Sequence, residues 1–117
     1  MHFVTDVQPD VLKMKYYDIQ KPQFVLSRYE ADGSLALGVM DEGRPMVLSV
    51  NLLDYGQIAP LNHVFVKDYA ENEGLPASLE AAGVAERVSP VSIGFGAGWL
   101  MKLSFDAESE VPGIPEE

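Results

Sequence analysis

Residues 68–73 hold a group of side chains that could do chemistry, because three carboxylates crowd one predicted turn. A calcium loop needs alternating Asp or Asn ligands around a fixed glycine, and this segment lacks that pattern, so we predict no metal site. Asp68 suits the N-cap of a helix, and Glu71 can complete a capping box. Tyr69, Asn72 and Glu73 are left for other contacts. We therefore predict a partner-binding turn made of Asp68, Tyr69, Glu71, Asn72 and Glu73.

The two histidines do not form a recognisable catalytic group. His63 has Asp54 and Asp68 nearby in sequence, which would suit a general base, but no nucleophile is framed beside it. Because His63 borders a predicted strand, an edge or surface histidine is the expected role. The chain also has no cysteine, no nucleophile elbow and no His-Glu-x-x-His motif. We predict that the protein is not an enzyme and uses no catalytic residues, metal or cofactor.

A glycine-rich run over residues 94–98, Gly-Phe-Gly-Ala-Gly, suggests a phosphate cradle at first sight. A cradle needs backbone N–H groups that converge on an anion at the start of a helix. Residues 99–103 instead alternate like a strand, and the run matches neither the Walker nor the dinucleotide pattern. We expect these glycines on one sheet face where a helix or loop packs closely, and we expect Trp99 to pack in the core.

The chain is strongly acidic, with a formal net charge of −10 over 117 residues. Residues 1–28 hold three acidic and four basic side chains, so the negative excess lies in residues 29–117. Phosphate backbones are bound by clustered Lys and Arg, which this sequence lacks, so direct nucleic-acid binding is disfavoured. An acidic surface suits a basic partner protein, and solubility alone is the simpler explanation of the same charge.

Neither a secretory signal nor a membrane-spanning segment is recognisable in the sequence. The first residues lack a basic region followed by an apolar run, and no apolar stretch approaches the roughly 18 residues that a membrane helix needs. We expect a cytoplasmic protein that does not bind membranes.

Turn residues between apolar runs predict the elements that hold the acidic turn. Asp32-Gly33 and Glu42-Gly43 separate three strands of a meander, and a fourth strand comes after a loop. These four strands are expected at residues 24–30, 35–40, 46–52 and 63–67.

Residues 69–83 predict two short helical turns or one kinked helix, because two glycines and a proline interrupt them. The apolar face of this helix consists of Leu75, Leu79 and Ala82. Residues 91–105 alternate with period two, which predicts a hairpin or a bent strand broken near residues 96–98. We predict an α+β fold, an antiparallel sheet of about five to six strands with one short or kinked helix packed on a face.

The same patterns divide the chain into three parts. Residues 21–105 are expected to form a single α+β domain. Residues 1–20 have apolar residues at helical spacing, but Pro9 interrupts them, so either an N-terminal arm or a short helix is predicted there. Residues 106–117 are acidic and contain prolines, which is typical of a disordered tail.

One part of the chain resembles a known family. Residues 67–74 read Lys-Asp-Tyr-Ala-Glu-Asn-Glu-Gly, and this block resembles a small domain family of unknown function found in phages, plasmids and integrative conjugative elements. The resemblance spans roughly residues 24–90, and the chain departs from the family pattern at residues 54–62 and 94–103. Further matching segments are residues 33–37, 49–52 and 81–84.

The resemblance implies an accessory protein of a mobile element that acts by occupying the surface of a host protein. Its sharpest form is an anti-CRISPR or anti-restriction inhibitor that binds a basic host or defence-system protein. The alternative is a self-associating structural or accessory protein with no inhibitory role. Such a protein would form a homo-oligomer through an exposed sheet edge or through the glycine face near residues 94–98.

Overall fold

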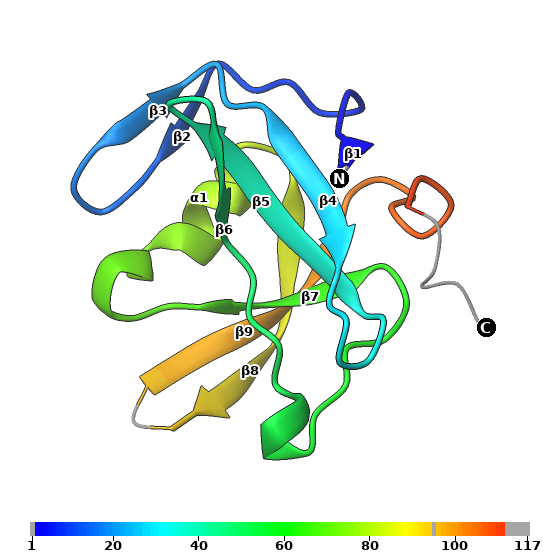
Figure 1. The fold of residues 1–117 in the computed structure, drawn as a ribbon. Coiled ribbons are helices and arrows are strands. Elements are labelled where there is room, and N and C mark those ends of the chain that lie inside the picture. The colour runs from blue at the N-terminus through cyan, green and yellow to red at the C-terminus, as the bar shows by residue number, and fades with distance from the viewer. Residues whose placement is uncertain (1, 95, 112–117) are drawn as a thin grey trace.

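The computed structural model describes residues 2–94 and 96–111, which form three antiparallel sheets and one α-helix (Figure 1). The strand orders are β1-β4-β5-β6, β2-β3 and β7-β9-β8. The strands are β1 (His2–Phe3), β2 (Val11–Lys13), β3 (Asp18–Gln20), β4 (Phe24–Arg28), β5 (Leu35–Asp41), β6 (Arg44–Val47), β7 (His63–Lys67), β8 (Ala85–Ile93) and β9 (Gly96–Leu103). The helical segments are the 3-10 turns η1 (Leu53–Tyr55) and η2 (Ala70–Asn72) and the helix α1 (Leu75–Ala81).

The α+β class is confirmed, but the prediction of one sheet with five to six strands is wrong. The sheet is divided because the chain bends after β6. The amides of Leu48 and Ser49 both donate to the Leu37 carbonyl, at 2.8 and 3.2 Å, which ends the regular pairing with β5. Val50 then pairs with Phe65 of β7 in an isolated bridge. The segment expected as one strand therefore leaves the four-stranded sheet and ends beside the three-stranded one.

Both predicted turns of the meander are present, and one is longer than expected. Glu42 and Gly43 have φ values of 52° and 80°, the left-handed conformations that a two-residue turn between β5 and β6 requires. The turn between β4 and β5 spans residues 30–33 rather than two residues. Asp32 stabilises this longer turn, because its carboxylate accepts hydrogen bonds from the Ser34 amide at 3.0 Å and hydroxyl at 2.7 Å.

The described part of residues 1–20 forms strands, which differs from the predicted arm or short helix. Strands β2 and β3 pair antiparallel with Leu12 opposite Ile19. Both side chains are buried in the main core together with Val4. The helical spacing of apolar residues gave a wrong prediction because the pairing of Leu12 with Ile19 joins two strands of a hairpin. Periodicity along one segment carries no information about such a pairing.

Residues 91–103 contribute to a hairpin, which is one of the two predicted alternatives, although its boundaries differ. Strand β8 begins at Ala85, and the hairpin turns at Gly94, where φ is 58°, rather than at the later glycines. A bulge after Arg87 interrupts the alternation of inward and outward side chains, so the sequence pattern did not predict the first half of β8 as a strand. Pro90 is tolerated because β8 lies at the edge of its sheet.

The main core lies between the two larger sheets and α1. Helix α1 buries Leu75 and Leu79, with Ala82 at the margin, which confirms the predicted apolar face. A second and smaller cluster lies on the other face of the three-stranded sheet, since neighbouring strand residues point to opposite faces. We call it the small core, and its buried members are Leu52, Phe65 and Ile93.

Residues 106–111, predicted as the start of a disordered tail, pack against the rest of the protein. Val111 is buried, and Arg28 donates to its carbonyl and to the Glu108 carboxylate, both at 2.9 Å. The Glu108 carboxylate also accepts from the Asn62 amide at 2.6 Å. These hydrogen bonds fix the segment to β4 and to the start of β7. The remainder of the predicted tail lies outside the described residues.

We predict that Glu108→Ala lowers the free energy of unfolding by about 2 kcal/mol, because the Asn62 amide loses the carboxylate that it shares with Arg28. The Arg28 guanidinium keeps its bonds to the Val111 and Gly33 carbonyls. Glu110→Ala is the matched control in the same turn. Among the described residues, the Glu110 carboxylate pairs with the more exposed His2, at 2.9 Å, and its loss should cost less than about 1 kcal/mol. Urea unfolding measures both, and equal costs for the two variants would contradict the prediction.

Candidate functional site

The predicted partner-binding turn is built where β7 ends and α1 begins. The Asp68 amide donates to the Ala97 carbonyl of β9 at 2.9 Å, and the Asp68 carboxylate accepts from the Gly74 amide at 2.8 Å. Gly74, with φ of 83°, is the N-cap residue of α1. Asp68 therefore closes the turn from strand to helix, rather than capping a helix that starts beside it.

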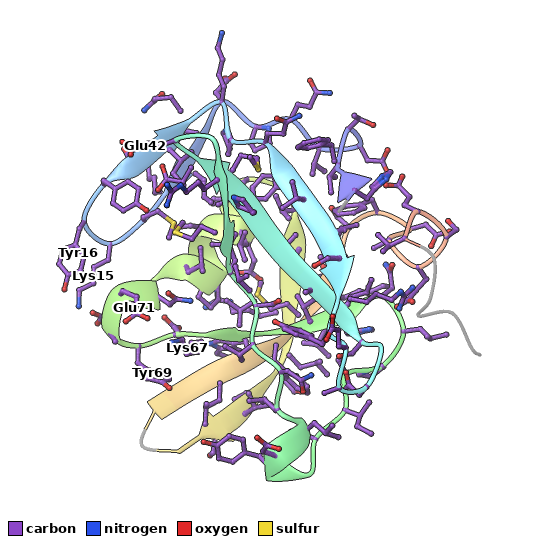
Figure 2. All side chains as sticks on the ribbon, in the orientation of Figure 1. Lys15, Tyr16, Glu42, Lys67, Tyr69 and Glu71 are labelled. Atoms are coloured by element: carbon purple, nitrogen blue, oxygen red, sulfur yellow. The ribbon has the colours of Figure 1, made fainter. Side chains whose placement is uncertain are left out.

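The predicted capping box is wrong, because Glu71 binds a lysine instead of reaching back to Asp68. The Lys67 Nζ lies 3.2 Å from Glu71 Oε1 and 5.4 Å from the centre of the Tyr69 ring. The pKa of Glu71 is lowered by a hydrogen bond from its own backbone N–H and by the Lys67 ammonium. One lysine thus ties the end of β7 to a carboxylate and a ring of the turn, as Figure 2 shows.

The glycine run allows the turn to lie directly on β9. A Cβ atom at Gly96 would clash with the Tyr69 ring, and a Cβ atom at Gly98 would lie 2.6 Å from Ile93 Cδ1. This confirms the expectation that the glycines permit close packing. Gly96 and Gly98 belong to strand β9 rather than to the start of a helix, so the run does not have the geometry of a phosphate-binding loop. Phe95 lies outside the described residues.

A second segment, the tip of the β2–β3 hairpin, lies beside this turn. Lys15 Nζ lies 2.7 Å from Glu73 Oε2 and 5.3 Å from the centre of the Tyr16 ring. The pKa of Lys15 is raised, chiefly by its hydrogen bond to Glu73. Figure 2 shows Lys15 and Tyr16 on the same side of the molecule as Tyr69. Sequence reasoning missed this hairpin tip, because contacts between segments so far apart along the chain leave no local pattern.

The turn between β5 and β6 lies on the other side of the hairpin. The Tyr17 hydroxyl donates to Asp41 Oδ2 at 3.2 Å and lies 3.5 Å from Met46 Sδ. The pKa of Tyr17 is raised by burial and by the negative charges of Asp41 and Glu42. Three segments therefore meet in one surface. We call it the tyrosine–carboxylate surface, and it consists of Tyr16, Tyr17, Tyr69, Asp41, Glu42, Glu71 and Glu73, with Lys15 and Lys67 between them.

The five residues of the predicted site stay close together but differ in role. Asp68 and the Tyr69 ring hold the turn in place, and the half-buried Asn72 donates its backbone amide to the Tyr69 carbonyl at 3.1 Å. Glu71 and Glu73 are exposed, and each is paired with a lysine. Glu71 and Glu73 can therefore present charge and Tyr69 an aromatic ring, while Asp68 and Asn72 serve the shape of the turn.

The other candidate groups do not assemble into a reactive site. His63 Nδ1 lies 2.7 Å from the Leu61 carbonyl, so its hydrogen-bond partner is a backbone group rather than one of the aspartates considered with it. Trp99 is half-buried against the main core, with the Arg87 guanidinium 5.2 Å from its ring. Within residues 2–94 and 96–111, no three side chains of the metal-binding types converge. No helix in the same part of the chain is long and apolar enough to cross a membrane.

Comparisons with protein-family models, with curated proteins and with solved structures found no match. The resemblance to the mobile-element family therefore stays a prediction.

We predict that Gly96→Ala destabilises the protein by about 2 kcal/mol, because the added methyl group displaces the Tyr69 ring. A double-mutant cycle tests this cause. In a Tyr69→Ala background the same substitution should cost less than about 1 kcal/mol, since the clashing ring is absent. Equal costs in both backgrounds, measured by urea unfolding, would show that Tyr69 does not pack on Gly96.

We predict that replacing Asp41 by Asn and Glu42 by Gln lowers the pKa of Tyr17. The two negative charges favour the neutral phenol, so their removal favours the phenolate, while the new amide at position 41 still offers a hydrogen-bond acceptor. The shift is partial, because burial is the largest cause of the raised pKa and is unchanged. An NMR titration of the Tyr17 ring carbon measures the pKa. An unchanged pKa would mean that the carboxylates of the β5–β6 turn do not lie beside Tyr17.

Proposed function

We propose that this protein is a non-enzymatic acidic interaction protein that binds a basic partner protein through the tyrosine–carboxylate surface. The observation that carries the proposal is the 2.7 Å pair between Lys15 and Glu73. This pair joins the β2–β3 hairpin to the acidic turn, so residues far apart in sequence present one continuous face. Without it, the turn would be an isolated group of charges and the hairpin an isolated pair of tyrosines.

The composition of the surface supports a protein partner. Tyr16 is 75% exposed and Tyr17 is 45% exposed, while Tyr69 is half-buried beside them. Tyrosine is enriched at protein interfaces and among their energetically dominant residues, because its ring gives a large contact area and its hydroxyl can hydrogen-bond. Exposed tyrosines next to charged groups are therefore typical of a surface that is covered in a complex.

The charge of the surface supports a basic partner. It holds four carboxylates and two lysines, so it keeps a negative charge even though Glu71 and Glu73 are paired within the chain. The net charge of −10 adds a long-range field of the same sign. Such a field speeds the encounter with a positively charged protein and is screened by salt.

The surface is also held in shape before any partner arrives. The Tyr69 ring is fixed on Gly96, and the turn is closed by the hydrogen bond between Asp68 and the Gly74 amide. Lys15 and Lys67 each bind one carboxylate and lie over one ring. Binding groups that are already ordered lose less conformational entropy on association, which favours affinity.

The mobile-element resemblance supports a narrower version of the proposal. In that version the partner is a basic host or defence-system protein in the cytoplasm, and the protein acts as an anti-CRISPR or anti-restriction inhibitor. The proposal includes no direct contact with nucleic acid or membrane. Occupying a basic surface that normally holds nucleic acid would be enough to inhibit such a partner.

The alternative function, self-association through the glycine face or a sheet edge, has less support. The glycine face near Gly96 is covered by the Tyr69 ring of the same chain. The β8 edge carries a bulge, a proline and charged side chains, which are devices that discourage pairing between edge strands.

The test is a tagged pull-down from nuclease-treated host lysate at low and high salt, followed by calorimetric titration of the partner it retains. We expect Glu71→Gln with Glu73→Gln to weaken binding about tenfold, because the uncharged amides keep the size of the side chains and remove two negative charges from the surface. Binding of the wild-type protein should weaken as salt rises.

The matched control is Glu80→Gln with Glu86→Gln, which removes two charges from another part of the protein. Glu80 is itself paired with Arg87 at 2.7 Å, so both double variants break ion pairs within the chain. The control should change affinity less than about twofold. Equal weakening by both variants would mean that only the net charge matters, and no change in either would contradict the proposed surface.

A further inference from the structure

Residues 55–61, which connect η1 to the start of β7, expose three large apolar side chains. Tyr55 is 57% exposed, Ile58 65% and Leu61 79%. The segment contains no charged residue, although the protein as a whole carries a net charge of −10. We call these residues the apolar loop. The tyrosine–carboxylate surface does not include it, and the proposed function leaves it without a role.

The apolar loop is held in a defined shape. The Leu52 carbonyl accepts hydrogen bonds from the amides of Tyr55 (2.9 Å) and Gln57 (3.1 Å), and the Pro60 carbonyl accepts from the His63 amide (3.2 Å). Ala59 packs against the small core, which anchors the middle of the loop. The exposed side chains are therefore presented by an ordered backbone, which lowers the entropic cost of burying them.

We infer that the apolar loop is a contact between two copies of this protein, which associate weakly and reversibly. Like charge makes two copies repel each other over most of their surface. An uncharged loop is where they can meet with the least repulsion. A basic partner, in contrast, is attracted to carboxylates and would bind elsewhere. The charge distribution that supports the proposed function therefore favours a second copy as the occupant of the apolar loop.

The exposed area sets the strength of this contact. The three side chains together expose on the order of 400 Å² per copy. Two copies that meet through the loop would bury on the order of 800 Å² from these side chains, which is below the roughly 1,200 Å² of a standard specific interface and within the range of weak, transient contacts. We therefore expect a weak dimer, with a dissociation constant on the order of 0.1 mM or higher.

The position of the loop leaves the hairpin part of the proposed binding surface accessible, whereas Tyr69 packs on the same small core as Ala59 of the loop. Figure 1 shows η1, from which the loop continues, at the end of the molecule away from the β2–β3 hairpin. The Tyr55 hydroxyl lies close to the β8–β9 turn, 3.6 Å from where a Cβ atom of Gly94 would be. A dimer through this end can therefore leave the tips of both β2–β3 hairpins, with Tyr16 and Tyr17, exposed.

Sedimentation equilibrium of the full chain over a range of concentrations tests the inference. Raising sodium chloride from about 0.05 to about 0.5 M should tighten the dimer about threefold or more, because salt screens the repulsion between copies. Ile58→Thr with Leu61→Thr should weaken it about tenfold or more. The control, Val47→Thr with Val88→Thr, changes two comparably exposed side chains on strands β6 and β8, and it should have less than about a twofold effect.

A measurement without substitutions checks the same contact in the native chain. The methyl NMR signals of Ile58 and Leu61 should shift with protein concentration, and those of Val47 and Val88 should not. A monomer at every concentration and salt, a dimer that salt weakens, or methyl shifts confined to the valines would each overturn the inference. None of these results bears on the basic partner, whose binding involves another surface and is expected to weaken with salt.

Discussion

The packing of the Tyr69 ring on Gly96 is the contact on which the candidate site depends. Because position 96 has no side chain, the turn after β7 lies against β9, and Asp68 can close on Gly74 at the start of α1. That placement puts Glu73 within reach of Lys15, and the β2–β3 hairpin is then held beside the turn. A single missing methyl group thus allows two distant segments to share one surface.

Charge acts here on the shape of the surface more than on the stability of the fold. Exposed ion pairs contribute little to the free energy of folding, since water and salt screen them. Their value lies in geometry, because each lysine of the surface fixes one carboxylate and lies over one ring. Under the proposed function, the excess of negative charge would attract a basic protein to the tyrosine–carboxylate surface. The same charge would oppose contact between two copies except at the uncharged apolar loop.

Local signals predicted much of this structure. The left-handed turn at Glu42-Gly43, the apolar face of α1 and the close packing at the glycine run all depend on residue types within a few positions. Long-range pairings could not be predicted. The switch of Val50 from one sheet to the other, and the contact of Lys15 with Glu73, depend on segments that sequence periodicity does not connect. The acidic turn was therefore identified, while the tyrosines beside it were missed.

Hydrogen exchange of the protein, alone and bound to the salt-sensitive partner retained from lysate, tests the shared binding surface most directly. We predict new protection of backbone amides at residues 14–18 and 67–74 together, since the proposed function assigns both segments to one binding surface. Residues 53–62 should exchange equally in both states at low protein concentration. Protection at the acidic turn without the hairpin, or at residues 53–62 alone, would contradict a shared tyrosine–carboxylate surface.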